Sequence, residues 1–290
     1  MKKIIIIIPI FNDWESLKQL LLEIDQVIKE IEGILVDCLV INDASTMKTP
    51  EINKPKNIKS LKILNMKQNK GHAKCNAFGI RYSIQKEKFD FLILMDGDGE
   101  DRPIELRSLI DKAKNDPNLS VVAKRVKRSE GIFFKTLYLM HKIITYIFTG
   151  KIINFGNYSC LTINDAKIIQ DKASLWNSYS GTIKKYLLDY NEIDSTRGKR
   201  FFGPSKMSFF NLIIHSFSII AVFKYQVLWR SIALLLILYP LSFFSPVITI
   251  FAQVILIVFN FIIIFMSFRE KEDELLRSHE NLKDINLIIH

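Results

Sequence analysis

The chain has 290 residues and a net charge of +10, and 49% of its residues are hydrophobic. This length is enough for one large domain or two ordinary ones with a buried core. The charge is compatible with nucleic acid, an anionic membrane surface or phosphate ligands. The sequence carries no helix-turn-helix, zinc-finger or aromatic RNA-binding signature, so we expect no nucleic-acid partner. The three cysteines share no metal-type spacing, which predicts buried thiols in a reducing, cytosolic environment.

The first 95 residues alternate between apolar runs typical of strands and segments with helical spacing. The first apolar run is too short for a secretion signal and is broken by Pro9. Asp13 is a candidate cap for the first helix. This alternation predicts an α/β fold with a mostly parallel sheet. The expected strands are 4–8, 34–41, 61–64 and 89–95, and the expected helices are 13–33 and 73–84.

Polar segments follow each of these four strands. In parallel α/β sheets, ligands bind at the carboxyl ends of the strands, so four polar loops on one edge predict a site there. The segments are 9–13, 42–43, 69–71 and 96–98.

Four carboxylates lie within six positions after the fourth expected strand, at Asp96, Asp98, Glu100 and Asp101. Carboxylates crowded at a strand end repel one another unless cations hold them, and their hard oxygen atoms suit Mg²⁺ or Mn²⁺. Mg²⁺ bound in this way is usually completed by substrate phosphates. The stretch therefore predicts a divalent ion that holds a nucleotide diphosphate, with a solvated acidic turn as the alternative.

The middle of the chain carries a second set of expected elements. A helix over 104–113 and a strand over 119–123 lead into Arg125 and Arg128, which either bind phosphate or form a solvated basic turn. The apolar segment 132–149 is expected to form a helix in the core or at an interface. An irregular strand is expected over 152–163.

No charged residue occurs from Ser231 to Phe268, a run long enough for two membrane passes. Pro246 marks the turn of a transmembrane hairpin with helices over about 230–244 and 247–268, the alternative being a buried helix pair. Basic residues flank the run and none lies in its turn, so the positive-inside rule predicts both termini to be cytoplasmic. We therefore expect an integral membrane protein. Its expected parts are a cytoplasmic catalytic domain (1–208), an interfacial amphipathic region (209–229), the hairpin (230–268) and a cytoplasmic tail with a short helix (269–290).

Together these residues resemble family 2 glycosyltransferases of the GT-A fold, and among them the polyprenyl-phosphate sugar transferases. The resemblance covers residues 4 to about 223 and extends to the membrane tail. The acidic run over 96–100 matches the family's Asp-x-Asp-x-Gln metal motif, and residues 200–206 match its Arg-x-x-Gly-x-Ser-Lys segment. The motifs that carry the resemblance are Ile8-Pro9-Ile10-Phe11-Asn12, Asn42-Asp43-Ala44-Ser45, Asn69-Lys70-Gly71, Asp96-Gly97-Asp98-Gly99-Glu100 and Arg200-Phe201-Phe202-Gly203-Pro204-Ser205-Lys206.

The resemblance implies a metal-dependent, inverting transfer of a sugar from a UDP- or GDP-linked donor to polyprenyl phosphate at the cytoplasmic membrane face. It assigns the matching residues to three overlapping groups. The donor-binding residues are Pro9, Phe11, Asp43, Lys70, Gly71 and Asp96, and the ligands of Mg²⁺ or Mn²⁺ are Asp96, Asp98 and Glu100. The residues for the donor diphosphate and the acceptor phosphate are Arg125, Arg128, Arg200, Ser205 and Lys206, and the catalytic set is Asp98, Asp101, Arg200 and Lys206.

The chain departs from the family pattern at two places. Glu100 replaces the usual amide, which adds negative charge near the metal. Asn154 and Asn157 stand where a carboxylate often follows the strand, so a hydroxyl acceptor would need another base, for which Asp101 is the nearest candidate. A phosphate acceptor is already anionic near neutral pH and needs little deprotonation.

Other functions are compatible with the sequence. The same fold could transfer the sugar to a lipid-linked glycan or another envelope saccharide. A noncatalytic, membrane-anchored module that binds nucleotide sugars is a second alternative, and a basic nucleic-acid binder is a weak third.

Overall fold

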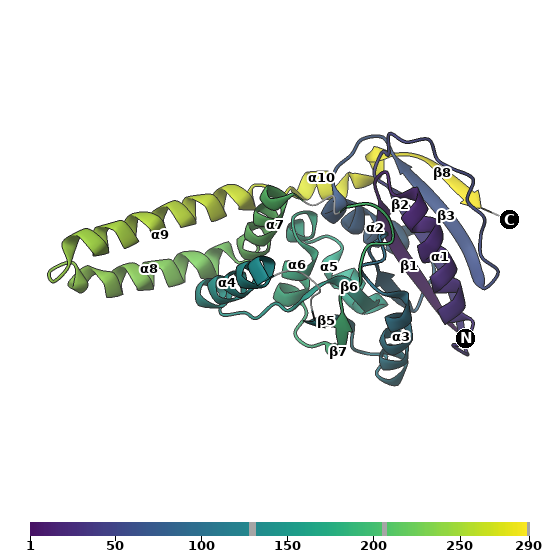
Figure 1. The fold of residues 1–290 in the computed structure, drawn as a ribbon, viewed down its shortest axis with the longest axis horizontal. Coiled ribbons are helices and arrows are strands. Elements are labelled where there is room, and N and C mark those ends of the chain that lie inside the picture. Colours follow the sequence, from purple (N-terminus) through teal and green to yellow (C-terminus); the bar gives the residue numbers. More distant parts are fainter. Residues whose placement is uncertain (128–131, 205–207, 289–290) are drawn as a thin grey trace.

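The computed structural model describes residues 1–127, 132–204 and 208–288. One end of the molecule is built on an eight-stranded sheet with the order β7-β5-β6-β4-β1-β2-β3-β8, flanked by helices on both faces (Figure 1). The strands are β1 (Lys2–Ile10), β2 (Ile34–Asn42), β3 (Ile58–Met66), β4 (Phe91–Leu94), β5 (Val121–Lys127), β6 (Phe155–Thr162), β7 (Asn191–Thr196) and β8 (Leu282–Ile288).

The isoleucine run of β1 is fully buried because helices cover both faces of the sheet. Alternate side chains point to opposite faces, so Ile4 and Ile6 join the core beneath one helical layer and Ile5 and Ile7 join the other. The first layer is α1 (Trp14–Ile28) with α3 (Leu106–Asn115), and the second is α2 (His72–Lys86), α5 (Ile163–Ile169) and α6 (Tyr179–Tyr186).

The four expected strands of the first half are confirmed and are parallel to one another. β1 pairs with β2 and β4, and β2 pairs with β3, all in parallel register. Their carboxyl ends therefore lie on one edge of the sheet, as the polar segments predicted. The expected cap at Asp13 is wrong in one respect: this residue occupies the N-cap position of α1, but its side chain caps no backbone amide.

The remaining strands give the sheet its mixed character. The strand expected over 119–123 is β5, and the irregular strand expected over 152–163 is β6. β6 runs antiparallel between β4 and β5, and β7, which the sequence did not indicate, pairs in parallel with β5. A short 3₁₀ turn at Pro103–Glu105 precedes α3, and another at Ala173–Trp176 precedes α6.

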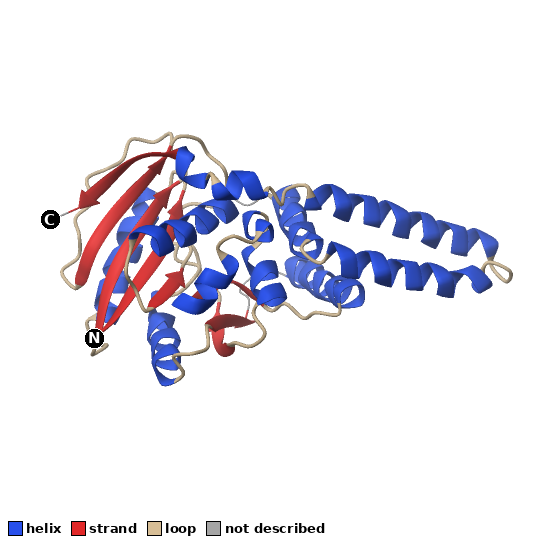
Figure 2. Ribbon diagram, turned by 180° about the vertical axis from the view of Figure 1, so that it is seen from behind, coloured by secondary structure: helices blue, strands red, loops and turns tan. Residues whose placement is uncertain are grey.

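Four long, apolar helices lie at the other end of the molecule. Two of them, α8 and α9, run side by side away from the sheet (Figures 1 and 2). Within the described residues, the helical segment Pro246–Leu276 is long and apolar enough to cross a membrane, and α7 with α8, bent by 86° at their junction, passes the same test as a pair. The chain breaks between α8 and α9 where the turn at Pro246 was expected, and α8 begins earlier than expected. The helices are α4 (Ile132–Thr149), α7 (Phe209–Ala221), α8 (Lys224–Leu241) and α9 (Pro246–Ser267).

The helix expected in the C-terminal tail is largely wrong. A single helical turn, α10 (Glu272–Leu276), and a 3₁₀ turn at Ser278–Asn281 lead back to the sheet, where β8 pairs antiparallel with β3. The apolar residues of the tail fit a strand because β3 otherwise presents an unpaired edge. Asn65 of β3 also donates a hydrogen bond to Asp284 of β8 (2.5 Å).

Candidate active site

Asp43 ties together two of the four loops at the carboxyl edge of the sheet. This buried residue follows β2, and its carboxylate accepts hydrogen bonds from the backbone N–H groups of Lys70 and Gly71, each at 2.8 Å. Gly71 has φ +91°, a conformation that side chains rarely adopt, and it precedes α2. The structure thus brings Asp43, Lys70 and Gly71 together, as the sequence predicted.

The loop after β1 lies beside the loop after β4. Pro9 belongs to β1, and its carbonyl oxygen would lie 3.0 Å from a Cβ added to Gly97, so only glycine fits there comfortably. Phe11, 39% exposed, follows at the strand end. The backbone N–H of Asn12 donates to Ser45 Oγ (2.8 Å), which links this loop to the one after β2.

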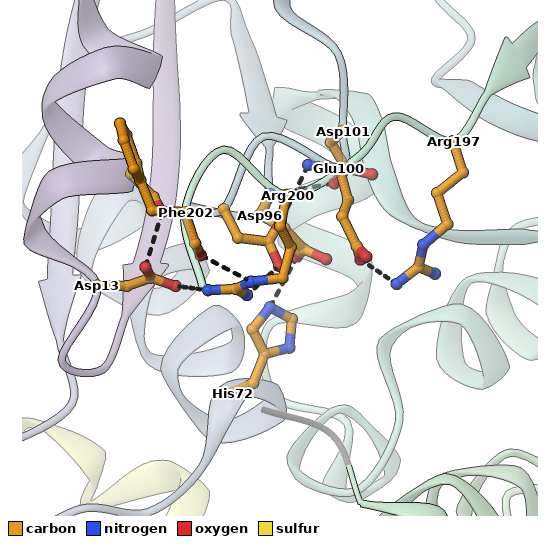
Figure 3. Close-up of polar contacts among 10 residues, drawn as sticks. Asp13, His72, Asp96, Glu100, Asp101, Arg197, Arg200 and Phe202 are labelled. Carbon is orange, nitrogen blue, oxygen red and sulfur yellow. Dashed lines mark hydrogen bonds and ion pairs between the residues drawn. The ribbon is translucent and has the colours of Figure 1, made fainter. Parts of the chain in front are cut away.

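The first carboxylate of the acidic run is paired with a histidine that the sequence pattern did not indicate. His72 is the first residue of α2, and its Nε2 lies 2.8 Å from Asp96 Oδ1 (Figure 3). The backbone N–H of Asp96 donates to Asp101 Oδ2 (3.0 Å), so Asp101 points back under the loop. Asp101 Oδ1 in turn lies 3.8 Å from the guanidinium of Arg125.

The other two carboxylates are paired with arginines from a distant segment, residues 197–202. Arg200 bridges Asp98 (2.8 Å) and Asp13 (2.5 Å), and Arg197 pairs with Glu100 (Figure 3). Backbone hydrogen bonds from Phe201 to Asp98 (3.0 Å) and from Gly198 to Glu100 (2.8 Å) hold this segment on the acidic loop. The Phe201 ring lies where a Cβ on Gly99 would be.

The donor set of the acidic run suits Mg²⁺ or Mn²⁺ in chemistry, because Asp96, Asp98 and Glu100 supply hard carboxylate oxygens at one strand end. In this conformation they do not form a ligand set: among the described residues, no three His, Cys, Asp or Glu side chains are grouped to hold a metal ion. Each of the three carboxylates instead contacts a basic side chain of its own, His72, Arg200 or Arg197.

Crowding separates the pKa values of these carboxyl groups. Burial, with the charge of Asp96, raises the pKa of Asp98 to about 6 and that of Asp101 to about 7. Burial acts in the same direction on Asp96, but the ion pair with His72 outweighs it and holds the pKa of Asp96 well below its usual range. The acidic run is therefore a site where added positive charge is favourable.

A basic region borders the acidic run on the side of α4 and α7. The Arg125 guanidinium packs against the backbone of Gly156, where a Cβ would lie 2.6 Å from it. His72, Arg125 and His141 lie within electrostatic range of His215 on α7, whose side chain is exposed. Four separate elements, α2, β5, α4 and α7, therefore bring basic side chains toward the same region. The remaining expected phosphate-binding residues, Arg128, Ser205 and Lys206, lie outside the described residues.

Sequence reasoning missed His72, Arg197 and the role of Asp13. A weak signal existed for the first two, since His72 directly follows the Asn69-Lys70-Gly71 motif and Arg197 stands three residues before Arg200. The sequence indicated a helix cap at Asp13, whereas its carboxylate accepts from Arg200 and from Ser16 Oγ (2.8 Å).

The chain is similar in sequence to curated bacterial enzymes. It is 28% identical over 229 residues to an undecaprenyl-phosphate 4-deoxy-4-formamido-L-arabinose transferase of Photorhabdus laumondii, covering 73% of this chain and 65% of the relative. It is 25% identical over 218 residues to the enzyme of the same name from Proteus mirabilis, covering 73% of this chain and 64% of that relative. The chain thus spans just under two thirds of the length of these relatives.

Solved structures share the fold at low sequence identity. Mannosyl-3-phosphoglycerate synthase from Rubrobacter xylanophilus superimposes with a TM-score of 0.56 at 12% identity, over 79% of this chain and 75% of that one. Glucosyl-3-phosphoglycerate synthase from Mycobacterium tuberculosis, solved with Mn²⁺ and UDP, superimposes with a TM-score of 0.52 at 12% identity, over 78% of this chain and 80% of that one. This likeness confirms the expected GT-A fold.

The family model described as glycosyl transferase family 2 matches residues 5–177, which include most of β1, strands β2 to β6 and the whole acidic run. The chain therefore belongs to glycosyltransferase family 2.

Proposed function

We propose that the protein transfers a sugar, with inversion, from a UDP- or GDP-linked donor to a polyprenyl phosphate at the cytoplasmic face of a membrane. One observation carries the proposal: the carboxylates of 96–101 and two arginines meet at the carboxyl edge of a parallel sheet, in a chain that also carries the apolar helices α8 and α9. The names of the undecaprenyl-phosphate transferases support the choice of acceptor.

The donor nucleotide is placed over the loops after β1, β2 and β3. Phe11 offers an exposed aromatic ring for a base. Asp43 holds the backbone of residues 70–71 in a fixed turn, which keeps Lys70 beside the donor site. Pro9 and Asp96 complete this side of the site, as the resemblance implies.

Inverting transfer requires stabilisation of the departing nucleotide diphosphate. A divalent ion held by Asp98 and Glu100, with Asp96 beside it, would supply Lewis-acid stabilisation to the two phosphates. Arg200 lies at the same loop, and a guanidinium is well suited to two phosphate oxygens at once. The mycobacterial synthase, which shares the fold and was solved with both Mn²⁺ and UDP, supports this assignment.

The acceptor phosphate is placed on the basic side of the site. Arg125, His141 and His215 lie there, and we assign Arg128, Ser205 and Lys206 to the same subsite from the family motifs. A phosphate monoester is anionic near neutral pH and attacks without a strong base. This fits a chain in which Asn154 and Asn157 replace a carboxylate.

The apolar helices are proposed to attach the enzyme to the membrane. α8 and α9 form the transmembrane hairpin, and their outward side chains are exposed: Leu236 of α8 is 69% exposed and Phe265 of α9 is 71% exposed. α7, with Phe210 75% exposed, lies in the interface. Residues 1–208 and the tail from 269 are then both on the cytoplasmic side.

A glycan hydroxyl is the second candidate acceptor, and the environment of Asp101 favours it. This carboxyl is buried and lies 3.8 Å from the guanidinium of Arg125 at the acceptor side. A carboxylate of this kind suits a general base. The nature of the labelled product distinguishes the two acceptors.

The test is transfer of label from a panel of UDP- and GDP-sugars into extractable lipid, with Mg²⁺ or Mn²⁺ present. We expect a labelled polyprenyl-phosphate sugar, and a loss of rate of about 10²-fold or more in Asp98→Asn, because charge stabilisation of the leaving group is removed. Asp194→Asn, an exposed carboxylate on β7, serves as the matched control and should retain the wild-type rate. Donor consumption with label in a lipid-linked glycan would favour the second acceptor, and full activity of Asp98→Asn with a chelator would refute the metal-assisted mechanism.

A further inference from the structure

Arg197 belongs to the site, yet no motif assigns it to a ligand. It lies on the same segment as Arg200, three residues earlier, and its guanidinium pairs with Glu100, a candidate metal ligand. Arg200 pairs in the same way with Asp98 at 2.8 Å. Two neighbouring arginines therefore contact two neighbouring carboxylates that the proposed reaction requires for a metal ion.

Backbone hydrogen bonds, and not only the two arginine side chains, hold this segment on the acidic loop. Gly198 and Phe201 already attach that segment to the acidic loop through backbone hydrogen bonds of 2.8 and 3.0 Å. The Phe201 ring packs over Gly99 between those two bonds. The guanidinium groups can change partners while the segment stays on the loop.

The charges of the site explain what would drive that change. With the carboxylates paired to arginines, a divalent cation alone meets two positive groups, and a diphosphate alone meets the carboxylates. When the two arrive together, the carboxylates can bind the metal and the guanidinium groups can bind phosphate oxygens, so every charge keeps a partner. Guanidinium binds phosphate and carboxylate with the same bidentate geometry.

We propose that Arg197 is a second donor-diphosphate residue, and that Arg197 and Arg200 pass together from Glu100 and Asp98 to the diphosphate when metal and nucleotide bind. This inference rests on the proposed function, since it requires a nucleotide diphosphate donor. Asp13, 2.5 Å from Arg200, holds that arginine at the site before the exchange. Metal and nucleotide should therefore bind with strong positive coupling, each weakly by itself.

The experiment measures Mn²⁺ binding to the purified full chain by electron paramagnetic resonance, with and without UDP or GDP. In the wild type we expect weak binding of Mn²⁺ alone and much tighter binding with the nucleotide. In Arg197→Gln we expect Mn²⁺ alone to bind about tenfold more tightly, because a competing cation is gone, while the enhancement by nucleotide falls about tenfold. A purely structural arginine does not produce these opposite changes.

Two further variants make the result specific. Arg197→Lys keeps a positive charge near Glu100 and should bind Mn²⁺ alone as weakly as the wild type. Arg107→Gln removes a guanidinium that lies 3.2 Å from Glu30, away from the site. Its affinity for Mn²⁺ alone and the enhancement by nucleotide should both stay at wild-type values. Thermal unfolding of each variant establishes that it is folded.

The inference is overturned if Arg197→Gln binds Mn²⁺ alone no more tightly than the wild type, or if nucleotide enhances that binding as much as before. When labelled lipid still forms under those results, the proposed function stands and this inference alone fails. A wild-type protein that shows no nucleotide enhancement overturns both. If Mn²⁺ and nucleotide bind with the expected coupling but no lipid is labelled, the result counts only against polyprenyl phosphate as the acceptor.

Discussion

At the scale of single residues, Asp43 shows how one carboxylate shapes the loops over which we propose that the donor binds. It accepts two backbone hydrogen bonds, from Lys70 and Gly71, and it is nearly inaccessible to water. Hydrogen bonds to an ionised acceptor contribute more than neutral ones, about 1.5–3 kcal/mol each. The turn before α2, and with it the position of His72, therefore depends on a charged group that lies on a different loop.

We expect Asp43→Asn to weaken binding of UDP or GDP, measured by calorimetry with Mn²⁺, by at least about tenfold. The amide keeps one acceptor oxygen but places an N–H₂ group against a backbone donor, so one hydrogen bond is lost. Asp111→Asn, at an exposed position of α3, is the matched control. Unchanged nucleotide affinity together with a lower melting temperature would show that Asp43 supports the fold alone.

At the scale of elements, the tail after α9 fixes the catalytic domain to the base of the long helices. Glu274 of α10 accepts hydrogen bonds from Lys271 (2.6 Å) and Trp176 (3.1 Å) and lies 3.5 Å from Lys74 of α2. Asn177, beside Trp176, donates to carbonyls of α7 and α9 at 3.4 Å each. These contacts couple three otherwise separate parts of the chain.

The hydrogen bond from Lys271 lowers the pKa of Glu274 from 4.5 to about 2, together with a hydrogen bond from Trp176 and the charge of Lys74. A carboxyl group whose pKa is lowered by folding stabilises the native state above its unfolded pKa, and that contribution is lost as the pH falls toward 2. We therefore expect Glu274→Gln to have a lower melting temperature than the wild type at pH 7, with the gap narrowing below about pH 4.5. The measurement is thermal unfolding in detergent across this pH range.

Glu272→Gln, at an exposed position of the same helix, is the control and should match the wild type throughout. A gap for Glu274→Gln that stays constant from pH 7 to pH 3 would contradict the assigned ion pairs.

At the scale of the whole molecule, the sheet domain and the α8–α9 pair lie at opposite ends (Figure 1). The link between α8 and α9 is the part farthest from the sheet in both views (Figures 1 and 2). If these helices span a membrane, this link crosses to the face opposite the catalytic domain. Basic residues at the sheet end, such as Lys224 and Arg269, support that orientation.

We expect a membrane-impermeant maleimide to label Ser245→Cys in intact cells and to label Ser108→Cys, on the sheet domain, only after the cells are broken. The two changes are near-isosteric, and the three native cysteines are buried, which keeps the background low. Labelling of both positions from the same side would contradict the hairpin.

The sequence alone determined the parallel part of the fold and the edge of the sheet at which most of the expected donor-binding residues gather. Apolar runs that end in polar residues are local patterns, and parallel strands necessarily bring such ends to one edge. Asp43, Lys70 and Gly71 were grouped correctly for this reason, and Asp96 and Asp98 were placed at the right strand end. The break between the long helices at Pro246 was equally readable, because proline starts a helix readily.

Only the tertiary structure decided which charges pair and how the chain ends. Arg197 and Arg200 lie about a hundred positions from Glu100 and Asp98, and no local pattern encodes such a contact. The tail becomes β8 because β3 offers an open edge, a property of the assembled sheet. Sequence periodicity is set by local geometry, whereas ion pairs and edge strands depend on which surfaces the fold brings together.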